Sequence, residues 1–298
     1  MKLPVFRQLP YISYSTYSKW KKCQHRVYLG KQSGLPFIQS SMGLAAQIGI
    51  AFDSFIKEWI VRHRKLYNPL VVLDKMLEGL PKETVDAGKA LAAKYIKCKL
   101  VEKFLKYGDI LVDQELYKNC GGIPILGRLD AMTNGLPFDW KTKAMASAKP
   151  GYPTKGASEQ YTWYLDGPNS RWHDNICRDT TSLEEANPDW AEQFCFYNWL
   201  LGNEDLNYHV HELTMTNDGL VICEFQGKIS KQFERTLRRN VERMWFELTD
   251  NMLFSEVAVP VPNRMLCEMY GTICEVAPHC KYYMDTLGNP ERRAWYVQ

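Results

Sequence analysis

Residues 123–143 read IPILGRLDAMTNGLPFDWKTK, and this stretch decides the predicted fold. Two strand-like segments flank Asn134-Gly135, a dipeptide that favours the two-residue turn of a β-hairpin. A hairpin of this length brings Asp130 next to Asp139. Asp139 and Lys141 lie two residues apart on one strand, so they point to the same face. The stretch therefore predicts paired strands that gather two carboxylates and a lysine.

The sequence around this hairpin predicts further strands and several helices. A strand over 109–117 and a turn at Gly121-Gly122 precede the hairpin, and strands over 207–215 and 220–227 form a second one. The predicted helices cover residues 11–31, 42–64, 70–107 with a break at Pro81, 189–201 and 230–253. Residues 143–188 lack periodicity, and we expect a long loop or insertion there. The predicted fold class is α/β, with a mixed sheet of about five strands flanked by helices.

The 298-residue chain has a formal net charge of +3, which is too small by itself to indicate a nucleic-acid-binding protein. Basic side chains nevertheless cluster at three places. The clusters are Lys19, Lys21, Lys22 and Arg26; Arg62, Arg64 and Lys65; and Arg235, Arg238, Arg239 and Arg243. The last cluster repeats at helical spacing, which leaves two interpretations open: a solvated helix face, or a surface that contacts phosphates.

The chain has no run of apolar residues long enough to predict a membrane span. Residues 1–10 lack the apolar region of a signal peptide, so we expect the protein in the cytoplasm. The nine cysteines are not expected to form disulfides in that compartment. They are therefore candidates for core positions, nucleophiles or metal ligands.

The two aspartates of the first hairpin suggest a metal site. Carboxylates that converge on one face repel each other unless a hard divalent cation lies between them. Such a cation lowers the pKa of a bound water and neutralises charge on a scissile phosphate, and Lys141 can stabilise that phosphate or orient the water. The alternative is a hairpin with exposed charges. Phe138 and Trp140 flank Asp139, however, which predicts one apolar and one polar face for this strand.

The order of the motifs resembles the RecB-like branch of the PD-(D/E)XK nucleases. That pattern runs G-x-x-x-H on a helix, then G-x-x-D, then D-x-K, then Q-x-x-x-Y on a helix. Residues 127–130 fit the second motif, 139–141 the third and 193–197 the fourth. The resemblance covers most of the chain and implies a restriction-endonuclease-like core that hydrolyses DNA with Mg²⁺ or Mn²⁺.

Two features depart from the family pattern. Residues 49–53 have the glycine and the spacing of the first motif, but Asp53 stands in the position of the histidine. Aspartate also binds hard cations. About fifty residues separate Lys141 from Gln193, and residues 160–164 also read Q-x-x-x-Y. We prefer Gln193 because its surroundings are helical and a strand pair follows.

The resemblance implies a role for each matching residue. Asp130, Asp139, Asp53 and the backbone carbonyl of Trp140 would bind the metal. Lys141 would stabilise charge or orient water, and Gln193 and Tyr197 would hold the DNA. Glu115 lies on the preceding strand and is a further candidate to support the site.

The cysteines near the two ends of the chain suggest a second resemblance. Cys23 and its surroundings look like the N-terminal helix of iron–sulfur members of the same branch, which include AddB-type nuclease domains and CRISPR-associated exonucleases. Cys267, Cys274 and Cys280 would complete a [4Fe–4S] cluster. Six residues lie between Cys267 and Cys274, which departs from the usual spacing of two. Zinc, or no metal at all, remains an alternative.

The combined expectation is a single nuclease domain over 1–298. It would comprise an N-terminal helix (1–39), a helical lobe (40–107), a nuclease core (108–253) with an insertion at 143–188, and a cysteine-bearing tail (254–298). We expect a DNA exonuclease acting on single-stranded ends in recombination, repair or CRISPR adaptation, in the cytosol of a prokaryote or a phage-infected host. A recombination or repair protein is an expected partner. The alternative is a nucleic-acid-binding or structural subunit with a weakened nuclease site.

Overall fold

The computed structural model describes residues 11–24, 27, 43–64, 77–98, 101, 110–143, 160–165, 171–176, 182–216, 219–249, 268–269 and 272–273. The chain divides into two compact units. The sheet unit comprises residues 42–118 and 126–234, and the terminal unit comprises residues 1–41, 119–125 and 235–298. The assignment of the whole chain to one nuclease domain stays a prediction.

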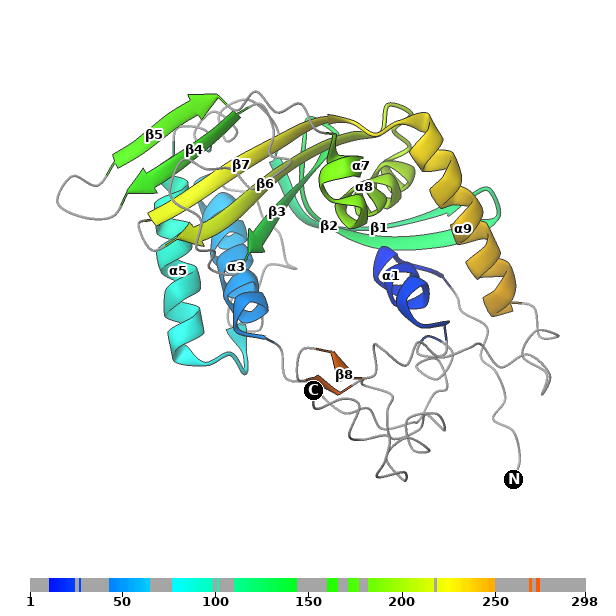
Figure 1. Cartoon of the computed structure of the whole chain (residues 1–298), viewed down its shortest axis with the longest axis horizontal. Helices are drawn as coiled ribbons and strands as arrows, with labels where there is room; N and C mark the ends of the chain where they lie inside the picture. The colour runs from blue at the N-terminus through cyan, green and yellow to red at the C-terminus, as the bar shows by residue number, and fades with distance from the viewer. Residues whose placement is uncertain are drawn as a thin grey trace, which may run out of the picture. The chain divides into compact units, whose positions relative to one another are not determined.

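A seven-stranded sheet organises the described part of the chain, in the order β1-β2-β3-β6-β7-β4-β5 (Figure 1). Its strands are β1 (Ile110–Cys120), β2 (Ile123–Thr133), β3 (Leu136–Lys143), β4 (Gln160–Leu165), β5 (Arg171–Ile176), β6 (Asn207–Thr216) and β7 (Gly219–Lys228). β3 and β6 run parallel, whereas β2–β3, β6–β7, β7–β4 and β4–β5 are antiparallel. The predicted α/β class with a mixed sheet flanked by helices is therefore confirmed.

Helices of the sheet unit cover both faces of the sheet. α3 (Leu44–Arg64) and α5 (Lys82–Ile96) share a buried core with Phe138 of β3, Leu213 of β6 and Ile222 of β7. α8 (Pro188–Leu201), which follows the short α7 (Leu183–Ala186), packs on the other face. The ring of Phe194 on α8 meets that of Tyr208 edge to face, at 6.4 Å between centroids. Alternate residues of β3 and β6 therefore face different helices.

The sheet extends into the segment that we expected to be a loop. Residues 143–188 contain β4, β5 and α7. β4 pairs along its whole length with β7, from Gln160↔Glu224 to Leu165↔Gly219. A strand that is specified by its partner can form without strong periodicity of its own, because cross-strand pairing supplies much of its stability.

The other predicted elements differ mainly at their ends. Helix 42–64 is confirmed as α3, and helix 189–201 as α8. Of the helical stretch predicted over 70–107 with a break at Pro81, the structure describes α5 (Lys82–Ile96), which begins directly after Pro81, and the helical residues Leu77 and Val101; residues 70–76, 99–100 and 102–107 lie outside the described ranges. Proline has no backbone N–H to continue a helix, so it commonly marks the start of one. α9 (Lys231–Thr249) lies within the predicted 230–253.

The terminal unit contains α1 (Tyr14–Lys22), most of α9, and the two-residue strands β8 (Glu268–Met269) and β9 (Thr272–Ile273). Ser13 caps α1 by accepting a hydrogen bond from the backbone N–H of Thr16 at 3.2 Å. The guanidinium of Arg243 on α9 lies 5.3 Å from the ring centroid of Trp20. This member of the third basic cluster therefore packs on an aromatic ring. None of the described helices is long and apolar enough to cross a membrane.

Candidate active site

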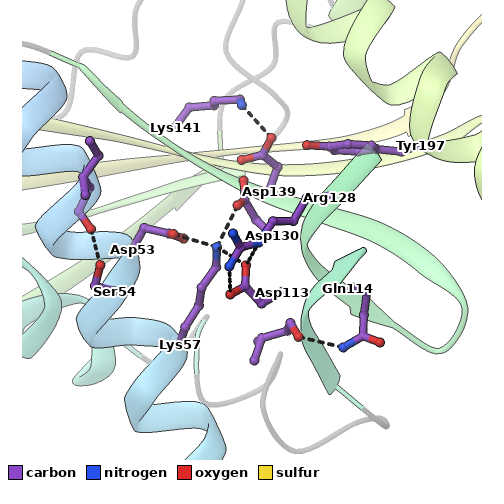
Figure 2. A network of polar contacts seen from close by, with 12 residues as sticks. Asp53, Ser54, Lys57, Asp113, Gln114, Arg128, Asp130, Asp139, Lys141 and Tyr197 are labelled. Carbon is purple, nitrogen blue, oxygen red and sulfur yellow. Dashed lines mark hydrogen bonds and ion pairs between the residues drawn. The ribbon is translucent and has the colours of Figure 1, made fainter. Parts of the chain in front are cut away.

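Asp130 and Asp139 lie where β2 and β3 separate. The pairing of these strands ends at Ala131↔Phe138, and β3 then pairs with β6 from Asp139↔Val210 onward. The two aspartates are therefore the first residues beyond the last β2–β3 pair, and Figure 2 shows their side chains close together. The structure confirms the predicted juxtaposition of the two carboxylates.

The carboxylate of Asp139 is fully buried. Neither of its oxygens has a hydrogen bond of normal geometry to a described residue, although Oδ2 lies 2.5 Å from Lys141 Nζ. Burial raises the pKa of Asp139 well above its usual value, and the charge of Asp130 adds to this effect. A buried carboxylate with so little compensation is a group that a cation would stabilise.

The pKa of Asp130 shifts in the opposite direction from that of Asp139. Burial tends to raise its pKa, but the ammonium groups of Lys57 and Lys141 hold the pKa below its usual value. Neighbouring carboxylates whose pKa values move apart are typical of a pair in which only one member readily ionises. A divalent ion between them would allow both to ionise.

Helix α3 adds a lysine that the sequence analysis missed. Lys57 Nζ donates to Asp130 Oδ1 at 2.8 Å and lies 2.6 Å from Asp53 Oδ2 (Figure 2). Burial and the charge of Asp130 raise the pKa of Asp53 to about 7, despite the ion pair with Lys57. The i,i+4 spacing of Asp53 and Lys57 on a predicted helix is the signal that could have identified this pair.

A fourth aspartate supports Lys57 from β1. Asp113 Oδ1 lies 3.4 Å from Lys57 Nζ, and both carboxylate oxygens of Asp113 receive hydrogen bonds from Arg128. Asp113 is buried and has a φ of 59°, a left-handed conformation that costs free energy in a non-glycine residue. Glu115, the supporting candidate from the sequence, is exposed on β1, whereas Asp113 is buried and contacts Lys57 and Arg128. A role for Glu115 stays a prediction.

Helix α8 holds Lys141 from the other side. Lys141 Nζ donates to Gln193 Oε1 at 2.9 Å, and Gln193 Nε2 donates to Tyr197 Oη at 2.5 Å. Gln193 and Tyr197 share a helix face because they are four residues apart. The competing Q-x-x-x-Y of residues 160–164 lies on strand β4, so the structure supports the choice of Gln193.

Two motif glycines allow the close packing that forms this site. A Cβ atom at Gly49 would lie 2.5 Å from Thr142 Oγ1, where α3 crosses β3. A Cβ atom at Gly127 would lie 2.5 Å from Leu200 Cδ1, where β2 meets α8. The glycines of the first and second motifs therefore have a steric role. They let a helix approach the strand that carries the neighbouring functional residue.

The oxygen-rich donor set fits a hard divalent cation such as Mg²⁺ or Mn²⁺. Asp130 and Asp139 offer carboxylate oxygens side by side, and the buried Asp139 carboxylate has Lys141 as its ion-pair partner but no hydrogen bond of normal geometry to a described residue. Asp53 is linked to Asp130 through Lys57. The side chain of Trp140 points away from this set, since its Nε1 donates to Tyr95 Oη at 2.8 Å. Metal binding by Asp53 and by the Trp140 carbonyl stays a prediction.

The iron–sulfur prediction falls largely outside the described residues. Cys23 lies half-buried at the C-terminal end of α1, whereas Cys267, Cys274 and Cys280 lie outside the described ranges. Cys98, Cys195 and Cys223 are buried. The cluster stays a prediction.

No protein-family model matches the sequence. No curated protein matches it either. Among solved structures, a "putative exonuclease" from Eubacterium rectale is 12% identical, with a TM-score of 0.51 over 92% of this chain and 87% of that one. A second structure, SSO0001, is 13% identical, with a TM-score of 0.29 over 79% of this chain and 85% of that one. The comparison with the Eubacterium rectale protein shows that the two chains share a fold.

Proposed function

We propose that this chain is a divalent-metal-dependent nuclease that hydrolyses phosphodiester bonds of DNA. The observation that carries the proposal is the pair Asp130 and Asp139 at the point where β2 and β3 separate, with Lys141 beside Asp139. The exonuclease description of the Eubacterium rectale structure, whose fold this chain shares, supports it.

Asp130 and Asp139 would hold one Mg²⁺ or Mn²⁺ ion. When bound, such an ion supplies Lewis acidity and lowers the pKa of a coordinated water. Lys141 would place its ammonium group against the scissile phosphate, where negative charge develops during attack. The hydrogen bond to Gln193 fixes the position of Lys141, and Tyr197 in turn fixes Gln193.

Lys57 would provide a second, permanent positive charge at the same site. Its ammonium group contacts Asp53, Asp113 and Asp130, so it neutralises carboxylates that would otherwise repel both each other and a phosphate. The three carboxylates raise the pKa of Lys57 although burial alone would lower it. In this arrangement Asp53 anchors Lys57 and is not needed as a metal ligand.

Metal affinity separates the two roles of Asp53. The Asp139→Ala variant should lose most Mn²⁺ affinity in a calorimetric titration. The Asp53→Asn variant should keep affinity within about threefold if Asp53 anchors Lys57, because removing a metal-supporting group typically costs at least tenfold. A loss in Asp53→Asn as large as that in Asp139→Ala would assign Asp53 to the metal instead.

Single-stranded DNA ends are the proposed substrate, by analogy with the exonuclease description of the structural neighbour. The exposed arginines Arg235 and Arg239 on α9 are candidate phosphate contacts. A recombination or repair partner and a [4Fe–4S] cluster belong to the same proposal and rest on the family resemblance.

The decisive experiment is a degradation assay with single-stranded DNA labelled at the 5′ or the 3′ end in the presence of Mn²⁺. The wild-type protein should shorten the labelled strands, and Asp139→Ala should lose at least about a hundredfold in rate. Asp86→Asn is the matched control, because this aspartate on α5 is exposed and forms its ion pair with Lys82 of the same helix. Equal degradation by wild type and Asp139→Ala, or none by either, would reject catalysis at this site.

A DNA-binding protein with a weakened nuclease site is the second candidate. It is favoured by one observation: Lys57 already occupies part of the coordination capacity of Asp53 and Asp130. Salt-dependent retention of single-stranded DNA by a wild-type protein that does not cleave would support this candidate.

A further inference from the structure

A second polar cluster lies on the opposite face of the sheet from Asp139 and Lys141. His209 and His211 are two residues apart on β6 and therefore share a face, and Glu224 of β7 pairs directly with His211 in the strand register. His209 Nε2 lies 2.7 Å from Glu224 Oε1, and His211 Nε2 lies 3.5 Å from the same oxygen. The proposed nuclease mechanism uses none of these three residues.

We propose that His209, His211 and Glu224 form a binding site for a transition-metal ion of the zinc class. The three potential ligand atoms all lie within 4.8 Å of one another. Tetrahedral zinc with bonds of roughly 2.0–2.2 Å places its ligand atoms about 3.3 Å apart. The distances from Glu224 Oε1 to the Nε2 atoms of His209 and His211, 2.7 and 3.5 Å, fall on either side of that value. Small side-chain rotations would therefore suffice to admit an ion.

The ligand chemistry distinguishes this site from the aspartate site. Two imidazole nitrogens and one carboxylate oxygen suit Zn²⁺ and similar borderline ions, whereas Mg²⁺ prefers all-oxygen sites such as Asp130 and Asp139. The cluster should therefore select a different metal from the one proposed for catalysis. This inference does not rest on the proposed function.

Neighbouring side chains orient His211 as a metal ligand requires. Tyr95 Oη lies 2.5 Å from His211 Nδ1 and receives a hydrogen bond from Trp140 Nε1 at 2.8 Å. This arrangement engages Nδ1 and directs Nε2 toward Glu224. Metal-binding histidines are usually held in this way through their second ring nitrogen. The ring of Phe138 packs edge to face on both imidazoles, with centroids 4.8 Å away.

The cluster has one buried member and two members that are partly exposed to solvent. His211 is fully buried, whereas the side chains of His209 and Glu224 are 15% and 14% exposed. A water from the partly exposed side would serve as the fourth ligand. An ion would join β6 to β7 behind β3, the strand that carries Asp139 and Lys141, so it would stiffen the sheet beneath the proposed active site.

The metal-free alternative is a hydrogen-bonded network. In it, the Glu224 carboxylate accepts hydrogen bonds from one or both imidazoles and no ion is required. The two possibilities differ in what zinc does to the purified protein. In the metal-free network, zinc would leave the stability unchanged, or would act equally on variants that lack these side chains.

The test uses the full-length chain, stripped with a chelator and titrated with Zn²⁺ and separately with Co²⁺. Zinc should bind the wild type and raise its Tm by several degrees, because a ligand that binds only the folded state stabilises it. Cobalt should produce the visible absorption of a tetrahedral site. Both effects should be lost in His209→Gln and in Glu224→Gln, which replace partly exposed side chains and are the variants best able to fold.

Cys23→Ser is the matched control, because the predicted cysteine cluster could also bind zinc. It should keep the zinc-dependent rise in Tm that His209→Gln loses, and far-UV circular dichroism should show all three variants folded. Zinc bound equally by the wild type, His209→Gln and Glu224→Gln would overturn the proposal. So would a wild-type protein whose Tm and cobalt spectrum do not respond to metal.

Discussion

The two faces of β3 differ sharply in chemistry. Asp139 and Lys141 point toward α8 and carry charge, whereas Phe138 and Trp140 point toward α3 and α5 and lie in the core. Both Asp139 and Phe138 are fully buried. The apolar face gains free energy from burial, while on the polar face burial leaves a carboxylate without adequate compensation.

This contrast shows how a fold can hold groups that repel each other. Phe138 packs against Trp140 and His211 at centroid distances of 4.9 and 4.8 Å, which fixes the backbone of β3. A fixed backbone keeps Asp139 beside Asp130 even when no ion stabilises the pair. Packing on one face thus maintains the strained polar arrangement on the other.

The largest expected effect is the loss of stability when a side chain on the apolar face of β3 is truncated. Phe138→Ala should lower the free energy of unfolding by about 3–5 kcal/mol, because it leaves a cavity in a closely packed aromatic cluster. Chemical denaturation would measure the loss. Leu136→Ala is the control on the same strand, since Leu136 is 37% exposed and should cost less than about 1 kcal/mol. Similar losses in both variants would show that Phe138 has no special role in holding β3.

A substitution on the polar face of β3 should change the free energy of unfolding in the opposite direction. Asp139→Asn replaces a carboxyl group, which on folding must either take up a proton or be buried as a charge, with a neutral amide of the same shape, so in the presence of a chelator at neutral pH the free energy of unfolding should rise by about 1–2 kcal/mol. Nuclease activity should be lost in the same variant. A variant that is both inactive and clearly destabilised would mean that Asp139 contributes to folding without any metal.

The smallest effect concerns the contact that places α3 against β3. Gly49→Ala should lower the free energy of unfolding by about 1 kcal/mol, because the new Cβ would meet Thr142 Oγ1 at 2.5 Å. In a Thr142→Ala background the same change should instead stabilise the protein by about 0.5–1 kcal/mol, because alanine favours a helix interior over glycine. A double-mutant cycle measures this reversal. Equal effects in both backgrounds would rule out the proposed steric contact.

The parts of the site that were predictable came from short patterns. Alternation around Asn134-Gly135 predicted the hairpin that brings Asp130 and Asp139 together, and the spacing of Gln193 and Tyr197 predicted one face of α8. Strands β4 and β5 were not predicted. Their own sequences show no periodicity, and pairing with β7 specifies β4.

The residues that were missed meet only in three dimensions. Lys57 lies 56 residues from Asp113 and 73 from Asp130, and no local pattern links them. The same holds for Tyr95 and His211, although the two-residue spacing of His209 and His211 was visible on a predicted strand. Long-range contacts depend on how elements pack, and the amino-acid pattern of any one element carries little information about its distant partner.

The sequence by itself determined the α/β class, the hairpin of carboxylates, and the helix that presents Gln193 and Tyr197. These features follow from hydrogen bonding and periodicity within a few residues. The tertiary structure alone decided that β2 separates from β3 directly at Asp130 and Asp139, and that Lys57 contacts the carboxylates of Asp53, Asp113 and Asp130. The physical reason is the close packing of α3 on β3 at Gly49, which brings a helix side chain within 2.8 Å of Asp130.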